Sequence, residues 1–196
     1  PMLLRAVIED KLYVGQALDE ETAMDFKCLK MSKLCTYQPF CDDFGPIKLS
    51  QIFRFIQKLE LELGNLEDEK IAVCCDHDDK RELSNAVFVL GAFLILKYKT
   101  SIERVHRCFE WADEICEPFR DASYLKPDFE LSIADCWRAL DRARSKGWIK
   151  YGGRSSDWGE YNVNEYEHYD SFANGHLHVL VPGKIVALRG PRTIAG

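Results

Sequence analysis

A cysteine and an arginine at the two ends of residues 75–81 have the types and the spacing needed for phosphoryl chemistry. Cys75 follows a short apolar run typical of a strand, and an apolar stretch typical of a helix comes after Arg81. A thiolate at a helix N-terminus can attack phosphorus. A guanidinium can bind two phosphate oxygens at once. The segment therefore has the outline of a loop that binds and cleaves a phosphate ester.

That outline is typical of a protein-tyrosine-phosphatase loop, but the residues inside it argue against activity. Residues 76–80 include three aspartates and no glycine. Carboxylates would repel a phosphate dianion and raise the pKa of the thiol. Without glycine, the loop also lacks the easiest route to the left-handed backbone conformation of an anion cradle. We predict a vestigial turn whose acidic groups pair with Lys80, Arg81 or solvent.

An active loop of this kind would need a general acid in addition to its nucleophile and its phosphate clamp. Asp42 and Asp43 lie roughly thirty positions upstream of Cys75, a distance at which such enzymes carry their acid. The degenerate candidates are therefore Cys75, Arg81 and one of these two aspartates, although no catalytic residue is expected in this chain. His77 and its acidic neighbours are contiguous, so they cannot surround a tetrahedral metal ion without distortion. Neither a metal nor another cofactor is expected.

A second group of charged residues lies near the C-terminal end of the sequence. Residues 164–173 are acidic and rich in tyrosine, and the pattern predicts a short helix that carries Glu165, Glu167 and Asp170. The spacing of Glu167 and Asp170 places their carboxylates on one helix face. These acids could form one wall of a groove that binds lysine or arginine, or they could belong to an ordinary solvated surface.

Composition limits the remaining functions. The chain has 196 residues, 46% of them apolar and 30% charged, which suits one ordinary globular core. Its net charge of −6 and its dispersed cations argue against a nucleic-acid partner. The longest apolar run, residues 86–96, is too short to span a membrane. Eight cysteines are many, but the chain is too long to need disulfide staples, so we expect a reducing compartment. The absence of a Cys-x-x-Cys pair argues against structural zinc.

Alternating strand and helix patterns predict an α/β domain with a central sheet flanked by helices. We expect a hairpin at residues 6–15, helices beginning near residues 19, 50, 83, 100 and 132, and strands at 35–40 and 70–74. The helix after residue 19 is expected to extend to residue 30. Residues 178–188 have the composition of one or two further strands.

Together these segments resemble the N-terminal domain of the Cdc14 family of dual-specificity protein phosphatases along nearly the whole chain. The resemblance rests on residues 10–13, 42–46, 75–81 and 118–123, and above all on residues 165–169 with 174–175, 181–184 and 190–191. The active-site signature of the family's catalytic domain, His-Cys-x-x-Gly-x-x-Arg followed by Ser or Thr, is absent, because Cys74 precedes Cys75 and Glu82 follows Arg81. The chain is therefore similar to the degenerate, non-catalytic copy of the phosphatase fold.

The resemblance implies three segments. Residues 2–160 would form the degenerate phosphatase-like domain, 161–176 a linker helix, and 177–196 the first strands of a following catalytic domain. In the family, the linker helix borders a groove that selects phosphoserine-proline sites with a basic residue downstream. The resemblance thus implies phosphoprotein partners, a catalytic-domain partner, and a nuclear or cytoplasmic location, including spindle poles or centrosomes. Alternatives are a small active phosphatase that uses Cys75 and Arg81, and a free-standing module that binds peptides.

Overall fold

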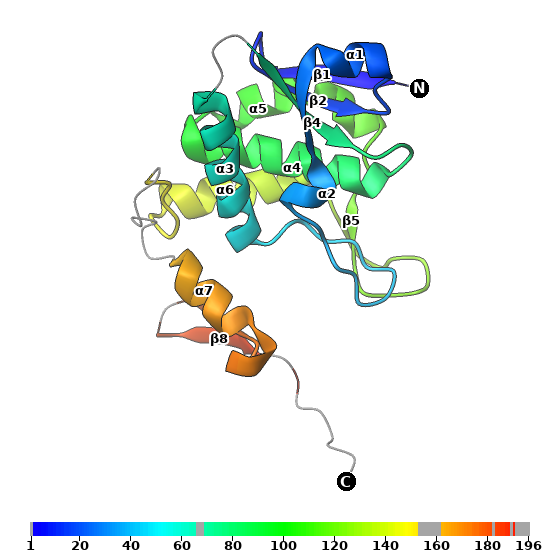
Figure 1. Cartoon of the computed structure of the whole chain (residues 1–196). Helices are drawn as coiled ribbons and strands as arrows, with labels where there is room; N and C mark the ends of the chain where they lie inside the picture. Colours follow the sequence, from blue (N-terminus) through cyan, green and yellow to red (C-terminus); the bar gives the residue numbers. More distant parts are fainter. Residues whose placement is uncertain (1, 66–68, 153–161, 182, 189, 191–196) are drawn as a thin grey trace. The chain divides into compact units, whose positions relative to one another are not determined.

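The computed structural model describes residues 2–65, 69–152, 162–181, 183–188 and 190 (Figure 1). The chain divides into two compact units, Pro1–Lys146 and Gly147–Gly196, called here unit 1 and unit 2. Each unit has its own secondary structure. They are therefore described one after the other.

Unit 1 is built on a mixed sheet of four strands in the order β1-β2-β4-β3. Strands β1 (Leu3–Ile8) and β2 (Leu12–Gln16) form the antiparallel hairpin predicted from the sequence. Strand β4 (Lys70–Cys75) lies parallel to β2 on one side and to β3 (Phe26–Lys30) on the other. The sheet therefore delivers the residues that follow β4 to an edge where β2 and β3 also end.

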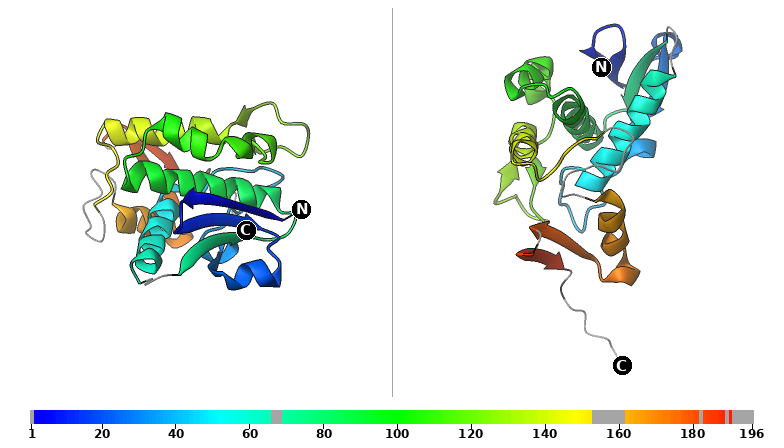
Figure 2. Two further views of the ribbon diagram at one scale, coloured as in Figure 1. Left: turned by 90° about the horizontal axis from the view of Figure 1, so that it is seen from above. Right: turned by 90° about the vertical axis from the view of Figure 1, so that its left-hand side faces the viewer.

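Helices surround this sheet. The remaining elements of unit 1 are α1 (Glu20–Met24), α2 (Met31–Leu34), α3 (Leu49–Gly64), α4 (Lys80–Lys97), α5 (Ile102–Cys108), η1 (Glu110–Glu114), β5 (Phe119–Arg120), β6 (Glu130–Leu131) and α6 (Ile133–Ser145). Every residue of α4 from Leu83 to Leu96 is buried. Figure 2 shows the reason, since α4 runs between the strands and the layer formed by α5 and α6. The fold is mixed α/β with a central sheet flanked by helices, as the sequence predicts.

A glycine allows α4 and α6 to pack closely. A Cβ atom at Gly91 would lie 2.3 Å from the Trp137 ring of α6, far inside van der Waals contact. The indole Nε1 of Trp137 donates a hydrogen bond of 3.0 Å to the carbonyl oxygen of Phe88. The aromatic ring therefore packs against the one position of α4 that carries no side chain.

Two sequence predictions of secondary structure in unit 1 are wrong. The single helix predicted for residues 19–30 is replaced by α1 and by β3, because residues 26–30 pair with β4 and tertiary pairing overrides a weak local pattern. The strand predicted for residues 35–40 is also absent: α2 ends at Leu34, and the chain then turns around the carboxylate of Asp43.

Unit 2 consists of a helix, a short 3-10 turn and a hairpin. Its elements are α7 (Val163–Asp170), η2 (Phe172–Asn174), β7 (Leu177–Val181) and β8 (Ile185–Leu188). Strands β7 and β8 pair antiparallel. Gly175 and Gly183 adopt φ values of 98° and 68°, which glycine tolerates best. The predicted helix and strands of this region are confirmed, while the predicted boundary near residue 160 lies outside the described residues.

Candidate functional site

The loop between β4 and α4, residues 76–79, lies between the cysteine and the arginine of the Cys-x5-Arg segment. Asp79 is the N-cap of α4, and its side chain accepts a hydrogen bond of 2.8 Å from the backbone N–H of Glu82. Asp78 adopts φ of 62°, so an aspartate makes the left-handed turn for which glycine is missing. The Gln16 side chain, at the end of β2, holds the loop by donating hydrogen bonds of 3.0 Å to the carbonyl oxygens of Asp76 and Asp79. The loop is therefore an ordered turn that supplies the N-cap residue of α4.

Cys75 does not have the properties of a nucleophile. It is the last residue of β4, and only 7% of its surface is exposed. Burial first, and then electrostatic interactions with the neighbouring acidic groups of Glu82, Cys74, Asp79 and Cys116, raise the pKa of the Cys75 thiol far above its usual value. A thiol in these surroundings stays protonated at neutral pH and is unreactive.

Arg81 is engaged in ion pairs rather than facing an open cradle. Its guanidinium lies 3.0 Å from a carboxylate oxygen of Asp42 and 3.3 Å from one of Glu117. The same group stacks over the Phe44 ring at 5.6 Å. Asp42 also accepts a hydrogen bond of 2.8 Å from Arg120. Asp42 therefore lies beside Arg81, as the phosphatase hypothesis requires, but as an ion-pair partner.

Asp43 has a different environment from its neighbour. Its carboxylate accepts a hydrogen bond from the Tyr37 hydroxyl and bonds of 2.7 Å from the backbone N–H groups of Phe40 and Cys41. Burial acts to raise the pKa of Asp43, but the hydrogen bonds from Cys41, Tyr37 and Phe40 outweigh it and lower the pKa to about 2. This carboxylate organises the turn after α2 and carries no proton to donate near neutral pH.

Glu82 is the functional residue that the sequence analysis missed. Its Oε2 atom accepts a hydrogen bond of 2.5 Å from the backbone N–H of Asp76, and its carboxylate also accepts one from the backbone of Ser32 in α2. Desolvation raises the pKa of Glu82, while these two bonds act in the opposite direction. A backbone donor that would face a phosphate in an anion cradle is thus bound by a carboxylate of the chain itself. The sequence signal is the Asp-x-x-Glu spacing of Asp79 and Glu82, which resembles a capping box.

In unit 2, the predicted acidic residues lie on α7. The N-cap Asn162 accepts a hydrogen bond of 3.0 Å from the backbone N–H of Glu165, whose side chain is exposed. Asp170 pairs with Nε2 of His178 in β7 at 2.5 Å. Tyr166 stacks on the same imidazole, with ring centroids 4.7 Å apart. Asp170 therefore braces the hairpin, while Glu165 and Glu167 lie nearer the start of the helix.

The hairpin of unit 2 exposes apolar side chains. Its exposed residues are Val179, Leu180, Ile185, Val186 and Leu188. In the described part of the chain, the sheet formed by β7 and β8 has only these two strands. A two-stranded sheet with apolar side chains in water is marginally stable by itself. The hairpin is therefore suited to packing against further structure.

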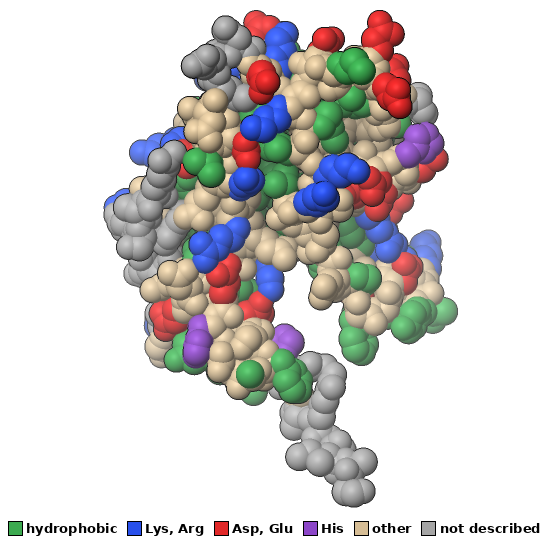
Figure 3. Space-filling model, viewed as in Figure 1, with side chains coloured by type: hydrophobic (Ala, Val, Ile, Leu, Met, Phe, Trp, Pro, Cys, Tyr) green, Lys and Arg blue, Asp and Glu red, His purple; other side chains and the backbone are tan. Residues whose placement is uncertain are grey.

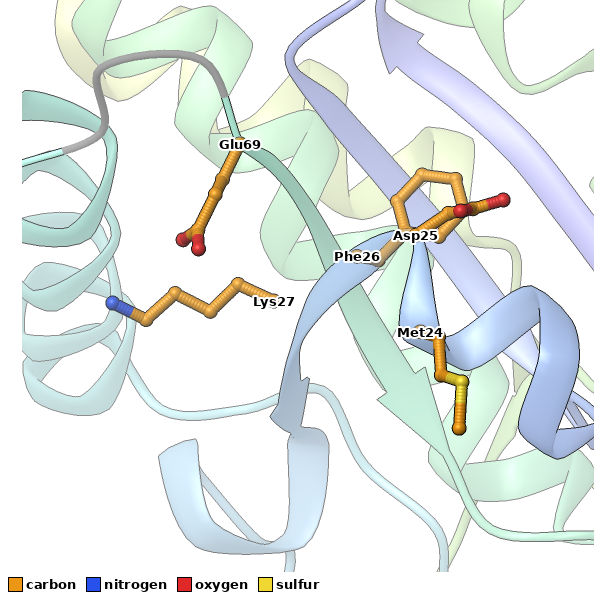
Figure 4. A pocket seen from close by; sticks show the side chains of 5 residues that line it. All are labelled: Met24, Asp25, Phe26, Lys27 and Glu69. Atoms are coloured by element: carbon orange, nitrogen blue, oxygen red, sulfur yellow. The ribbon is translucent and has the colours of Figure 1, made fainter.

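Other surfaces offer weaker candidates for a site. On the face shown in Figure 3, acidic and basic side chains are interspersed over unit 1. A pocket near the start of β3 is lined by Met24, Asp25, Phe26, Lys27 and Glu69 (Figure 4), and the Lys27 amine lies 2.8 Å from Glu62 of α3. Among the described residues, no cluster of three metal-binding side chains occurs. No described helix is long and apolar enough to cross a membrane.

The fold and the β4–α4 loop define the class of protein: a phosphatase-like α/β domain with a Cys-x5-Arg loop whose cysteine is buried. Comparison with known families agrees, because residues 6–143 match the family described as the N-terminal half of dual specificity protein phosphatases. The chain belongs to this family. The resemblance inferred from the sequence is confirmed.

Similar curated proteins are named as Cdc14 phosphatases. The chain is 31% identical over 187 residues to dual specificity protein phosphatase CDC14AB of Danio rerio, covering 94% of this chain and 30% of that protein. It is 28% identical over 187 residues to human CDC14A, and the match covers 94% of this chain and 30% of that protein. It is 30% identical over 157 residues to the tyrosine-protein phosphatase CDC14 of Saccharomyces cerevisiae, and the match covers 80% of this chain and 27% of that protein. The chain thus spans less than a third of the length of these relatives.

Proposed function

We propose that this chain is a non-catalytic, substrate-recognising and scaffolding domain of a Cdc14-like dual-specificity phosphatase that acts on phosphoserine-proline sites. The observation that carries the proposal is the closed β4–α4 loop. Its cysteine is buried, its arginine is paired with Asp42 and Glu117, and one of its backbone donors is bound by Glu82. Phosphate hydrolysis would then belong to a following catalytic domain.

The acidic side chains of α7 support recognition of a basic residue in the substrate. Glu165 is exposed in the first turn of α7, where a lysine or arginine can approach its carboxylate from water, and Glu167 is a half-exposed acidic residue two positions further along the helix. An exposed ion pair contributes roughly 0 to 1 kcal/mol. Such a contribution tunes selectivity and encounter rate more than total affinity. Asp170 would then act indirectly, by holding β7 against α7.

The exposed hairpin supports the proposed arrangement of segments, with residues 2–160 as the recognition domain, 161–176 as the linker and 177–196 as the beginning of the catalytic domain. Uncovered strand edges and apolar side chains are liabilities unless another element covers them. We expect a catalytic domain to provide that cover, and phosphorylated proteins with basic residues to be the other partners.

The first test is hydrolysis of a small aryl phosphate by this chain. We expect no turnover above background for the wild type, for Cys75→Ser or for Cys108→Ser. Cys108 is a suitable control because it lies on α5, outside the β4–α4 loop. Activity that disappears only in Cys75→Ser would overturn the proposal and favour a small active phosphatase.

The second test concerns recognition and uses a fusion in which this chain replaces the matching N-terminal segment of the Danio rerio relative. The double substitution Glu165→Lys and Glu167→Lys should raise KM for a phosphoserine-proline peptide with a downstream lysine. It should leave KM for a small aryl phosphate unchanged. The matched control is Glu110→Lys with Glu114→Lys on η1 of unit 1. Equal changes for both substrates would contradict a recognition role for α7.

A further inference from the structure

Two cysteines of unit 1 lie on neighbouring parallel strands of the sheet and on the same face. In the register of β3 and β4, Cys28 is opposite Ala72, and Lys30 is opposite Cys74. Side chains two positions apart on a strand share a face, so Cys28 and Cys74 project from one face as diagonal neighbours. The two side chains are close enough to interact, because Cys28 acts on the pKa of the Cys74 thiol.

The two thiols differ in accessibility. Cys28 lies on the edge strand of the sheet and is exposed, whereas Cys74 lies on the inner strand and is partly covered. Burial first, and contact with Cys28 second, raises the pKa of the Cys74 thiol. The exposed Cys28 is therefore the thiol that meets a reagent from solvent, and Cys74 is positioned to react with the product.

We infer that Cys28 and Cys74 form a peroxide-sensitive dithiol that closes into a disulfide within unit 1. In the first step, the Cys28 thiolate attacks one oxygen of a hydroperoxide. The O–O bond breaks, Cys28 becomes a sulfenic acid, and hydroxide leaves to form water with the released proton. In the second step, the Cys74 sulfur attacks the sulfenic sulfur and the S–O bond breaks. The oxygen leaves as water with the thiol proton, so two thiols are oxidised and one peroxide is reduced.

The position of the pair predicts a readily reversible bond. Cys28 and Cys74 are diagonal rather than directly opposite in the register of β3 and β4, and disulfides usually join Cα atoms separated by at most about 6.8 Å. Closure must therefore draw the edge strand β3 toward β4 and leave the backbone strained. Strained, exposed disulfides are more easily reduced than structural ones. The pair is suited to cycling between states.

A disulfide between Cys28 and Cys74 would link the strands that lead to the two segments bound by the Glu82 carboxylate. Strand β3 continues directly into α2, where the Ser32 backbone binds the Glu82 carboxylate. Strand β4 continues into the loop, where Asp76 binds the same carboxylate. Figure 4 shows β3 and β4 side by side with Lys27 projecting toward α3. A Cys28–Cys74 bond would therefore fasten together the two strands that lead to the closed loop.

The test is treatment of the native, reduced chain with hydrogen peroxide, followed by intact-mass measurement and peptide mapping without reductant. We expect a loss of two hydrogen atoms, a crosslinked peptide containing Cys28 and Cys74, and full reversal by dithiothreitol. Cys28→Ser and Cys74→Ser should each abolish the crosslink, and the matched control Cys136→Ser on α6 should retain it. The wild-type map remains decisive even if Cys74→Ser does not fold.

Three results would overturn the inference. One is a sulfinic acid at Cys28 with no crosslink. Another is a disulfide that joins two copies of the chain through Cys28. The third is a crosslink to any other cysteine that persists in Cys74→Ser.

Discussion

The β4–α4 loop and the α7–hairpin segment differ in whether their side chains already have partners within the chain. The loop satisfies its own polar groups: Glu82 binds the Asp76 N–H, Asp79 caps α4, and Asp42 and Glu117 pair with Arg81. The hairpin leaves its apolar side chains in water. A segment whose groups are already paired gains little from a partner, whereas a segment that exposes apolar surface gains from being covered.

The difference indicates which region has retained interaction capacity. In the loop, residues with the outline of a phosphate site are used to stabilise the domain. In unit 2, one face of α7 is tied to the hairpin by Tyr166, Asp170 and His178, and the hairpin exposes apolar side chains. The presence of a motif in the sequence therefore does not identify a binding surface by itself. What matters is whether the polar groups of the motif are already hydrogen-bonded within the chain.

Amide hydrogen exchange should show the largest contrast between the two regions. Backbone amides of Ala72 and Val73 in β4 lie in a buried strand with partners on both sides, so they should exchange only through near-global opening. Amides of β7 and β8 belong to a two-stranded sheet that is marginally stable. We expect protection in β4 to exceed that in the hairpin by at least about a thousandfold. Similar protection would show that the hairpin is covered within this chain.

A matched pair of leucine truncations should give the next largest effect. Leu90 in α4 is 0% exposed and Leu188 in β8 is 68% exposed. We expect Leu90→Ala to lower the free energy of unfolding by about 2 to 5 kcal/mol, because it leaves a cavity in the core. Leu188→Ala should change it by less than about 0.5 kcal/mol. Urea unfolding measures both, and a large cost at Leu188 would break the contrast.

Removing the Glu82 carboxylate should have an intermediate effect on stability. Glu82→Ala leaves the backbone donors of Asp76 and Ser32 without their partner, and we expect a cost of about 1 to 2 kcal/mol in the free energy of unfolding. The control is Glu130→Ala, because Glu130 is exposed on β6. A cost at Glu82 no larger than that at Glu130 would mean that the loop does not depend on its internal carboxylate.

The smallest expected effect is a change in acid sensitivity. The folded-state pKa of Asp43 is about 2, below its usual value of 3.8, so the ionised carboxylate stabilises the fold above the usual value. That stability is lost as the pH falls from about 4 toward 2. The unfolding free energy of Asp43→Asn should therefore fall less steeply than that of the wild type across this window. Parallel curves would exclude Asp43 as a contributor to acid unfolding.

The sequence predicted the parts of the fold that rest on strong patterns. Apolar residues all round the helix predicted a buried α4, and turn residues predicted the hairpin of β1 and β2. Gly147 predicted where α6 ends. Strand β3 was missed because residues 26–30 have a weak local pattern and become a strand only through pairing with β4. Long-range pairing of this kind cannot be read from the segment alone.

The candidate site was predicted in outline and not in its contacts. The acidic residues of the loop were expected to pair with Lys80, Arg81 or solvent, but Asp79 instead caps α4, and the carboxylates that pair with Arg81 lie outside the loop. These carboxylates belong to Asp42 and Glu117, which are distant in sequence. The sequence also did not reveal that the Glu82 side chain turns back to the Asp76 N–H, because that depends on the left-handed turn at Asp78.

The Glu82 carboxylate has a thermodynamic consequence for the domain. A loop that is ordered by a bound oxyanion becomes more stable as the concentration of that ion rises, by mass action. Here the anion is covalently part of the chain, so its effective concentration is fixed and no ligand has to be recruited from solution. The order of this loop should therefore be insensitive to the phosphate, sulfate or tungstate content of the medium. The domain can present the same shape whether the cell is rich or poor in phosphate.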